Sequence, residues 1–245
     1  MFDANFRSRA IVPMAIFMAL AISAPVFSQA GAGLFGGLNA LPLLDGAKTR
    51  SVCAENPTGE KGKGGMAVPN PDEVKPAASA RAADALSQGW KVRPFLRVNA
   101  GETATLMDVA GPGAIQHIWM AASWWTRALV LKVYWDGEAG PSIETPVPDF
   151  FAVGHEKIAK VTSLAVVVNP SNALNCYWPM PFRKHARFTL TNESDKDLEL
   201  LAYQITYAEM PIPENAAYFH AQWRRAKTDT VNPYVILDGV KGTGM

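Results

Sequence analysis

The sequence of 245 residues has almost no net charge, only two cysteines and few segments of strong helix formers. Lys and Arg total 23 against 22 Asp and Glu, a formal charge of +1. This balance argues against a nucleic-acid partner and against a polybasic membrane patch. The cysteines have no His or Asp neighbours at metal-ligand spacing, so we expect no metal. We also expect no cofactor.

The N-terminal residues have the pattern of a secretory signal peptide. Arg7 and Arg9 precede an apolar stretch at 10–27, and Ser28-Gln29-Ala30 fits a cleavage site. We therefore exclude 1–30 from the fold and expect an exported protein, periplasmic or extracellular, with no membrane segment after cleavage. An uncleaved anchor is the alternative, because the apolar stretch is of marginal spanning length.

Export makes a disulfide possible for the two cysteines, Cys53 and Cys176. They could pair, or each could be a separately buried thiol. The sequence alone leaves both possibilities open.

Composition divides the next part of the chain. Residues 31–50 are rich in Gly, Ala and Leu without a period, and we expect a flexible lead-in. The Gly and Pro residues of 51–76 are typical of a loop. The Ala-rich segment 77–87 is compatible with a short helix.

From residue 90 onward the chain consists of short apolar runs separated by turns. Leu129, Leu131 and Val133 alternate with Lys132, the period of two of a half-buried strand. Asp136-Gly137 marks a tight turn. This texture predicts an all-β jelly-roll or β-sandwich domain over 51–228. The runs are 93–98, 104–110, 114–121, 128–135, 161–168, 182–191, 198–208, 218–223 and 234–237.

The last residues, 229–245, have the residue pattern of a strand, a turn and the beginning of another strand. A domain normally ends in polar, frayed residues. We therefore expect this segment to be the start of a truncated second jelly roll.

Three polar or aromatic segments are candidates for a binding site. The first is a Gly-rich loop with Glu55, Asn56 and Glu60. It lacks the Gly-Lys-Ser/Thr ending of a phosphate loop. Fixed acids and amides suit sugar hydroxyls. The alternative is a surface loop whose acids cap turns.

The second segment holds Tyr177 and Trp178 beside two prolines, which should hold both rings rigidly. Such rings can stack on sugars or fill a core. An exposed-looking pair, Trp124-Trp125, could be a sugar platform or a subunit contact.

The third segment is 218–225. As a strand it places His220, Gln222 and Arg224 on one face, with Phe219 and Trp223 on the other. The polar face could line a site. The alternative is an edge strand whose polar face is solvated.

Together these segments resemble glycoside hydrolase family 172, formerly a domain of unknown function of the DUF2961 type. Six blocks carry the resemblance and stand in the family's order from about residue 50 onward. The blocks are 54–62, 88–91, 111–119, 134–138, 175–184 and 218–225.

The resemblance implies an enzyme that cleaves α-furanosides, such as α-D-fructofuranosides or α-D-arabinofuranosides, with retention. It also implies two tandem jelly rolls, a homotrimer or a multiple of trimers, and two catalytic glutamates in the second half of the protein. Neither glutamate block is found here, so we identify no catalytic residue and expect this chain alone to be inactive. Asp136, Glu138, Glu144 and Asp149 lie in blocks that look structural. The alternative function is a non-catalytic carbohydrate-binding or assembly module.

Overall fold

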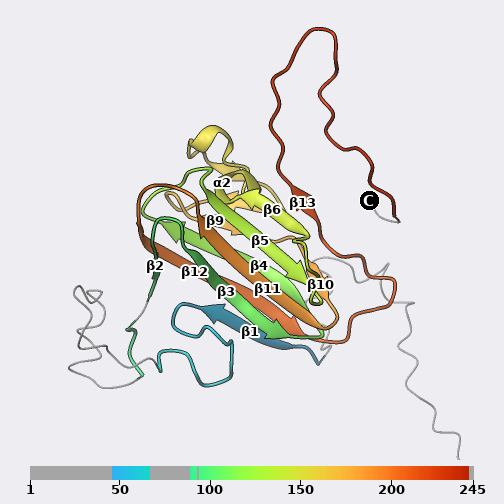
Figure 1. Ribbon diagram of the computed structural model, residues 1–245. Coiled ribbons are helices and arrows are strands. Elements are labelled where there is room, and N and C mark those ends of the chain that lie inside the picture. Colours follow the sequence, from blue (N-terminus) through green and yellow to red (C-terminus); the bar gives the residue numbers. More distant parts are fainter. Residues whose placement is uncertain (1–45, 67–88, 93, 243–245) are drawn as a thin grey trace, which may run out of the picture. The chain divides into compact units, whose positions relative to one another are not determined.

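The computed structural model describes residues 46–66, 89–92 and 94–242, which form a two-sheet β-sandwich (Figure 1). Only two single-turn helices interrupt the strands in these residues, α2 (Val147–Phe150) and η3 (Gly154–Glu156). The prediction of an all-β sandwich is confirmed. The signal peptide, most of the lead-in and the helix expected at 77–87 lie outside the described residues.

The first sheet has the strand order β1-β12-β4-β9-β8-β7, while β10 also pairs with β4 and β2 with β12. All of these pairs are antiparallel. Its strands are β1 (Lys48–Cys53), β2 (Leu96–Val98), β4 (Gly113–Ala122), β7 (Val161–Thr162), β8 (Val166–Val168), β9 (Leu174–Cys176), β10 (Met180–Phe182) and β12 (Leu198–Glu209).

The second sheet has the order β13-β6-β5-β11-β3. The pair β13–β6 is parallel and the others are antiparallel. Because β1 contacts β3, β1 lies by the edge of the second sheet that is farthest from β13. The strands are β3 (Thr103–Ala110), β5 (Leu129–Trp135), β6 (Ile143–Pro146), β11 (His185–Asn192) and β13 (Ala221–Gln222).

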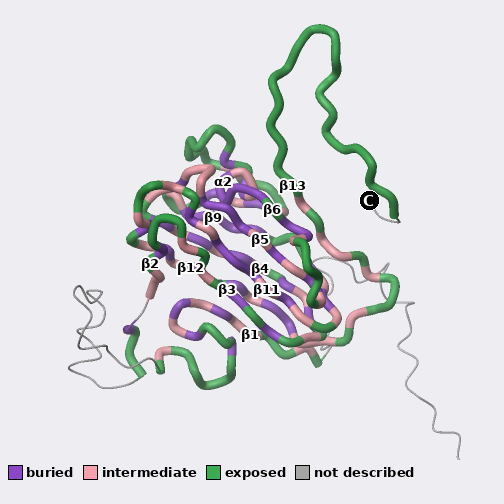
Figure 2. The backbone as a smooth tube through the Cα atoms, in the orientation of Figure 1, coloured by how far each residue is buried: buried purple, intermediate pink, exposed green. Residues whose placement is uncertain are grey.

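The core lies between the sheets and follows the alternation read from the sequence. Leu129, Leu131 and Val133 are fully buried, whereas Lys132 is half-buried (Figure 2). The Trp135 ring packs on Phe182 and edge-on against Phe188. Burial of such aromatic side chains contributes a large part of the hydrophobic stabilisation.

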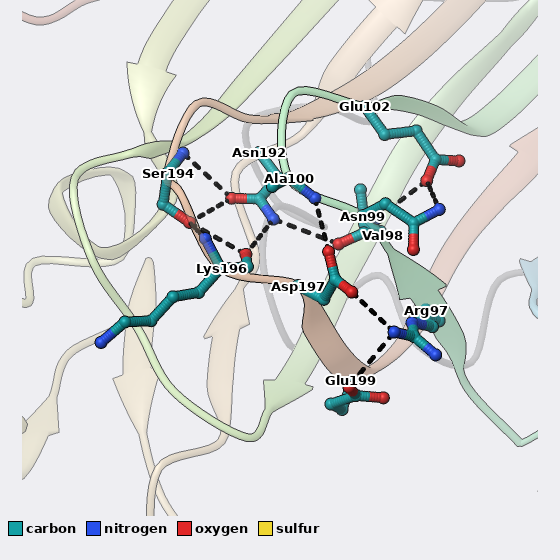
Figure 3. A network of polar contacts seen from close by, with 10 residues as sticks. All are labelled: Arg97, Val98, Asn99, Ala100, Glu102, Asn192, Ser194, Lys196, Asp197 and Glu199. Atoms are coloured by element: carbon teal, nitrogen blue, oxygen red, sulfur yellow. Dashed lines mark hydrogen bonds and ion pairs between the residues drawn. The ribbon is translucent and has the colours of Figure 1, made fainter.

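At one end of the sandwich a polar network joins the loop after β2 to the loop after β11 (Figure 3). The Asn192 side chain is fully buried and bonds to both loops. Asp197 accepts a hydrogen bond from the Ala100 N–H at 2.9 Å and pairs with Arg97 at 2.6 Å. These bonds satisfy backbone N–H and C=O groups that are not paired with a neighbouring strand.

Several local expectations need correction. β1 begins at Lys48, within the segment expected as lead-in, and continues into the segment expected as loop. The run 218–223 forms only the two residues of β13, and 234–237 forms no strand. Trp125 is 8% exposed and its indole N–H donates to the Asn172 carbonyl, so 124–125 is not an exposed pair. No helix of the described residues is long and apolar enough to span a bilayer.

The two cysteines are free thiols because of their places in the first sheet. Cys176 pairs with Ile118, which pairs with Ile205, whereas Cys53 pairs with the neighbouring residue Gln204. Three strand spacings of about 4.8 Å separate β9 from β1, and the side chains point to opposite faces. This is far beyond disulfide reach.

We expect the folded protein to react with a thiol reagent at Cys53 alone. Cys176 is buried, and burial raises the pKa of its thiol to about 11, against a weak opposing effect of the Trp178 N–H. A thiol reacts as its thiolate, so Cys176 should react only after unfolding. Titration with an aromatic disulfide reagent should show one thiol in buffer and both in denaturant. If no thiol could be titrated in denaturant, the two cysteines would be bonded to each other, which would contradict the register of the first sheet.

Candidate functional site

The loop after β1 is folded tightly back on its own strand. The backbone of Cys53 exchanges two hydrogen bonds with Asn56, and the Asn56 amide donates to the Glu60 carbonyl at 3.0 Å. Gly59 has φ +68°, and a Cβ there would meet Val52 Cγ2 at 3.0 Å, so glycine is required. Asn56 therefore holds the loop, and Glu60 is exposed on it.

Glu55 is the unusual residue of this loop. Both of its carboxylate oxygens are buried and find no hydrogen-bond partner among the described residues. A buried carboxylate without donors costs free energy. Both oxygens are closed to solvent, so the loop has to open before a hydroxyl group can donate to them and relieve that cost.

Trp178 is half-exposed, with 45% of its surface accessible, so it is not a core residue. Its ring makes a tilted contact with Phe219, with centroids 5.9 Å apart. The preceding Tyr177 is equally exposed and stacks on His117 at 4.6 Å, with 13° between the rings. The segment 175–184 therefore presents two aromatic rings at the surface.

The segment around β13 follows the expected alternation only in part, because Trp223 on the face opposite the polar one is also exposed. His220, Gln222 and Arg224 are exposed, and Arg224 donates to the Gln222 side chain at 3.3 Å. On the other side the Trp223 indole donates to Asp149 at 3.2 Å. β13 is also an edge strand, as the solvated-face alternative requires.

The predicted site residues do not form a single cluster within the described chain. Glu55, Asn56 and Glu60 follow β1, at the side where β1 meets β3. His220, Gln222 and Arg224 surround β13, at the opposite edge of the second sheet. Trp178 is linked to the β13 group through Phe219. The seven residues therefore divide into two groups.

The other acids considered have structural partners. Asp149 pairs with Arg127 at 2.7 Å, and Glu144 pairs with Lys132 at 2.9 Å. Glu138 accepts the N–H of Trp135, and the Asp136 carboxylate caps the backbone at 183–185. Within the described residues no three His, Cys, Asp or Glu side chains could hold a metal ion.

Sequence reasoning named Tyr177 but missed the side chains that surround it on the outer face of the first sheet. Trp119 on β4 lies opposite Asn175 on β9 and Gln204 on β12. Asn175 accepts a hydrogen bond from His117 at 3.2 Å, and Tyr177 covers the same histidine. The blocks 111–119 and 175–184 contain four of these residues, but no periodicity separates them from core residues.

The fold defines an all-β sandwich domain with aromatic rings and polar side chains at its surface. Residues 92–205 match the family model described as GH172 domain-like, so the chain contains a GH172-type domain. The match extends from the segment before β2 into β12 and includes Trp119, Asn175 and Trp178. The Glu55 loop and β13 lie outside it. No curated protein matches the chain.

Proposed function

We propose that the chain is the N-terminal part of a retaining glycoside hydrolase acting on α-furanosides, and that by itself it binds the sugar without cleaving it. The GH172-type domain supports a relation to glycoside hydrolases. The furanoside substrate rests on the resemblance of the sequence blocks. The partner is then a furanose-containing oligosaccharide or polysaccharide.

The observation that carries the proposal is the state of the carboxylates. Retention requires two facing carboxyl groups about 5–5.5 Å apart. Asp149, Glu144 and Asp136 are engaged by Arg127, Lys132 and the 183–185 backbone, and they are not free for this chemistry. Glu55 lacks a partner among the described groups. A buried carboxylate that lacks a partner among the described residues fits hydrogen bonding to a sugar hydroxyl better than double displacement, which needs two facing carboxyl groups.

The activity test uses the chain from residue 31 onward with aryl α-D-fructofuranoside and aryl α-D-arabinofuranoside. We expect no turnover at high protein concentration, together with calorimetric binding of the corresponding oligosaccharides. Turnover would overturn the statement that this chain is inactive. Absence of binding to both sugar types would overturn the carbohydrate assignment.

Glu55→Gln should weaken saccharide binding about tenfold, because a hydrogen bond to a charged acceptor contributes about 1.5–3 kcal/mol. The same change removes a buried charge, so the melting temperature should not fall. Glu60→Gln is the matched control, since Glu60 is exposed in the same loop. Equal affinities of the two variants would contradict the role of Glu55.

The alternative function is a non-catalytic carbohydrate-binding or assembly module, which predicts the same binding in a protein that has no catalytic partner domain. We further propose that the protein forms a homotrimer or a multiple of trimers, which light scattering of the purified chain tests. We also propose that the protein is exported, which N-terminal sequencing of the protein from culture medium or periplasm tests.

A further inference from the structure

The outer face of the first sheet is built from a row of side chains that crosses six strands. Ile118, Ile205 and Cys176 point into the core, so their neighbours in register point outward. The central strands β9, β4 and β12 lie side by side in this sheet (Figure 1). The row is Thr162, Val167, Asn175, Trp119, Gln204 and Cys53.

A second row runs beside the first. Ser51 pairs with Thr206, which pairs with His117. A β-bulge between His117 and Ile115 adds Gln116, which is exposed. Such a bulge re-aims side chains, and here it turns both Gln116 and His117 away from the core. Tyr177 lies against the exposed side of the His117 ring.

These two rows contain no Asp, Glu, Lys or Arg, although 18% of the chain is charged. They combine aromatic rings with amide and hydroxyl groups. The two rows therefore offer no opposite charge to phosphates, nucleic acids or acidic peptides. They match a neutral ligand that has an apolar ring face and many hydroxyl groups.

The polar part of this face is pre-organised. The Asn175 amide nitrogen donates to the carbonyls of Val167 at 3.2 Å and Asn169 at 3.1 Å. Both partners are acceptors, which fixes the amide orientation and directs its oxygen to His117 Nε2. His117 Nε2 therefore carries a proton and donates it to the Asn175 oxygen.

Because His117 is held by Asn175, it gives the Tyr177 ring a fixed surface to stack on. A ring already held in place loses little conformational entropy when a ligand binds. Trp119 and His117 are two positions apart along β4, about 7 Å. Trp119 thus follows His117 on the same face of β4, and a saccharide longer than one ring can contact both Trp119 and the His117–Tyr177 stack.

We propose that this outer face is a saccharide-binding platform, in which Trp119 and the His117–Tyr177 stack contact sugar rings, Gln204 and the hydroxyl groups of Ser51 and Thr206 bind the sugar hydroxyl groups, and Asn175 holds His117 in place. The proposal deepens the proposed function and rests on it, since it identifies the surface that holds the neutral furanose chain. The platform uses residues other than the Glu55 loop and β13.

The test titrates arabinofuranosyl and fructofuranosyl oligosaccharides into the chain from residue 31 onward and into its variants by calorimetry. Trp119→Ala and Tyr177→Ala should each weaken binding about tenfold or more, as expected for a central aromatic anchor. Tyr177→Phe should bind like the wild type because it keeps the stack. Gln204→Ala, at an exposed position that should not affect folding, should lose several-fold.

The matched control is Tyr134→Ala, which removes a ring from the second sheet, where Arg187 covers it at 4.0 Å. It should leave the affinity unchanged. If Glu55→Gln weakens binding while the three platform variants bind like the wild type, the platform is overturned and the proposed function stands. If the wild type binds neither sugar, the proposed function itself fails. Variants that dissociate an oligomer without changing saccharide affinity would show that the face is a contact between copies.

Discussion

Asp136→Ala should lower the free energy of unfolding by about 3 kcal/mol or more, although Asp136 lies in a surface turn. One carboxylate oxygen accepts the N–H groups of Arg183, Lys184 and His185 at 3.0, 2.7 and 3.0 Å. The other accepts the Tyr218 hydroxyl. Hydrogen bonds to a charged acceptor contribute about 1.5–3 kcal/mol each and are not additive. Urea unfolding followed by tryptophan fluorescence measures the loss.

Alanine also has to adopt the positive φ of 53° that Asp136 has. Asp136→Asn separates the two effects, because asparagine tolerates this conformation but carries no charge. Tyr218→Phe removes only one of the bonds and should cost about 1–2 kcal/mol. A loss below 1 kcal/mol for the alanine variant would show that the carboxylate does not hold the turn.

The same carboxylate makes stability depend on pH. Burial alone would raise the pKa of Asp136, but the bonds from Tyr218 and the backbone of Lys184, His185 and Arg183 outweigh it and hold that pKa below its usual value. The stabilisation is therefore fully present above the unfolded pKa near 3.9 and is lost as the pH falls through the folded value. The difference between wild type and Asp136→Ala should shrink below about pH 4.

This turn matters for the candidate site because it places the approach to β13. The Arg183 guanidinium donates to the carbonyls of Pro213, Glu214 and Ala216, and it lies 4.9 Å from the Tyr218 ring centroid. Asp136 accepts the hydroxyl of the same tyrosine. Together they fix the chain directly before Phe219, which contacts Trp178.

The sequence predicted those parts of the fold that follow a local rule. The alternation at 129–135 became β5, and Asp136-Gly137 became a turn with positive φ at both residues. These features depend only on side-chain period and turn chemistry. The order of the strands does not, because it depends on which distant segments pair.

For the same reason the candidate site was predicted only in part. The exposed Trp178 and the polar face of 220–224 were recognised from their residue types, but their separation from the Glu55 loop follows from sheet order. Asn175 carries no pattern of its own, since β9 has three residues and all are buried. Its place on the outer face becomes visible only through its register with Trp119.

Asn192→Ala should lower the free energy of unfolding by about 2–4 kcal/mol, through the end of the sandwich opposite the Asp136 turn. The buried amide donates to the Val98 carbonyl at 3.1 Å and to the Lys196 carbonyl at 2.7 Å, while its oxygen accepts from Ser194 at 2.7 Å (Figure 3). Alanine leaves these buried groups unsatisfied, and each costs about 1–3 kcal/mol. Thermal and urea unfolding should report the loss.

Arg97→Ala is the control from the same network, because its ion pairs with Asp197 and Glu199 are exposed and should contribute at most about 1 kcal/mol.

Asn192→Asp is the sharper test. A carboxylate there would face two carbonyl oxygens, whereas a protonated carboxyl could donate to one of them. Its folded state should therefore gain stability as the pH falls toward 4, opposite in sign to the acid loss expected from Asp136. Equal acid profiles for Asn192→Asp and wild type would show that the Asn192 amide does not donate to these carbonyls.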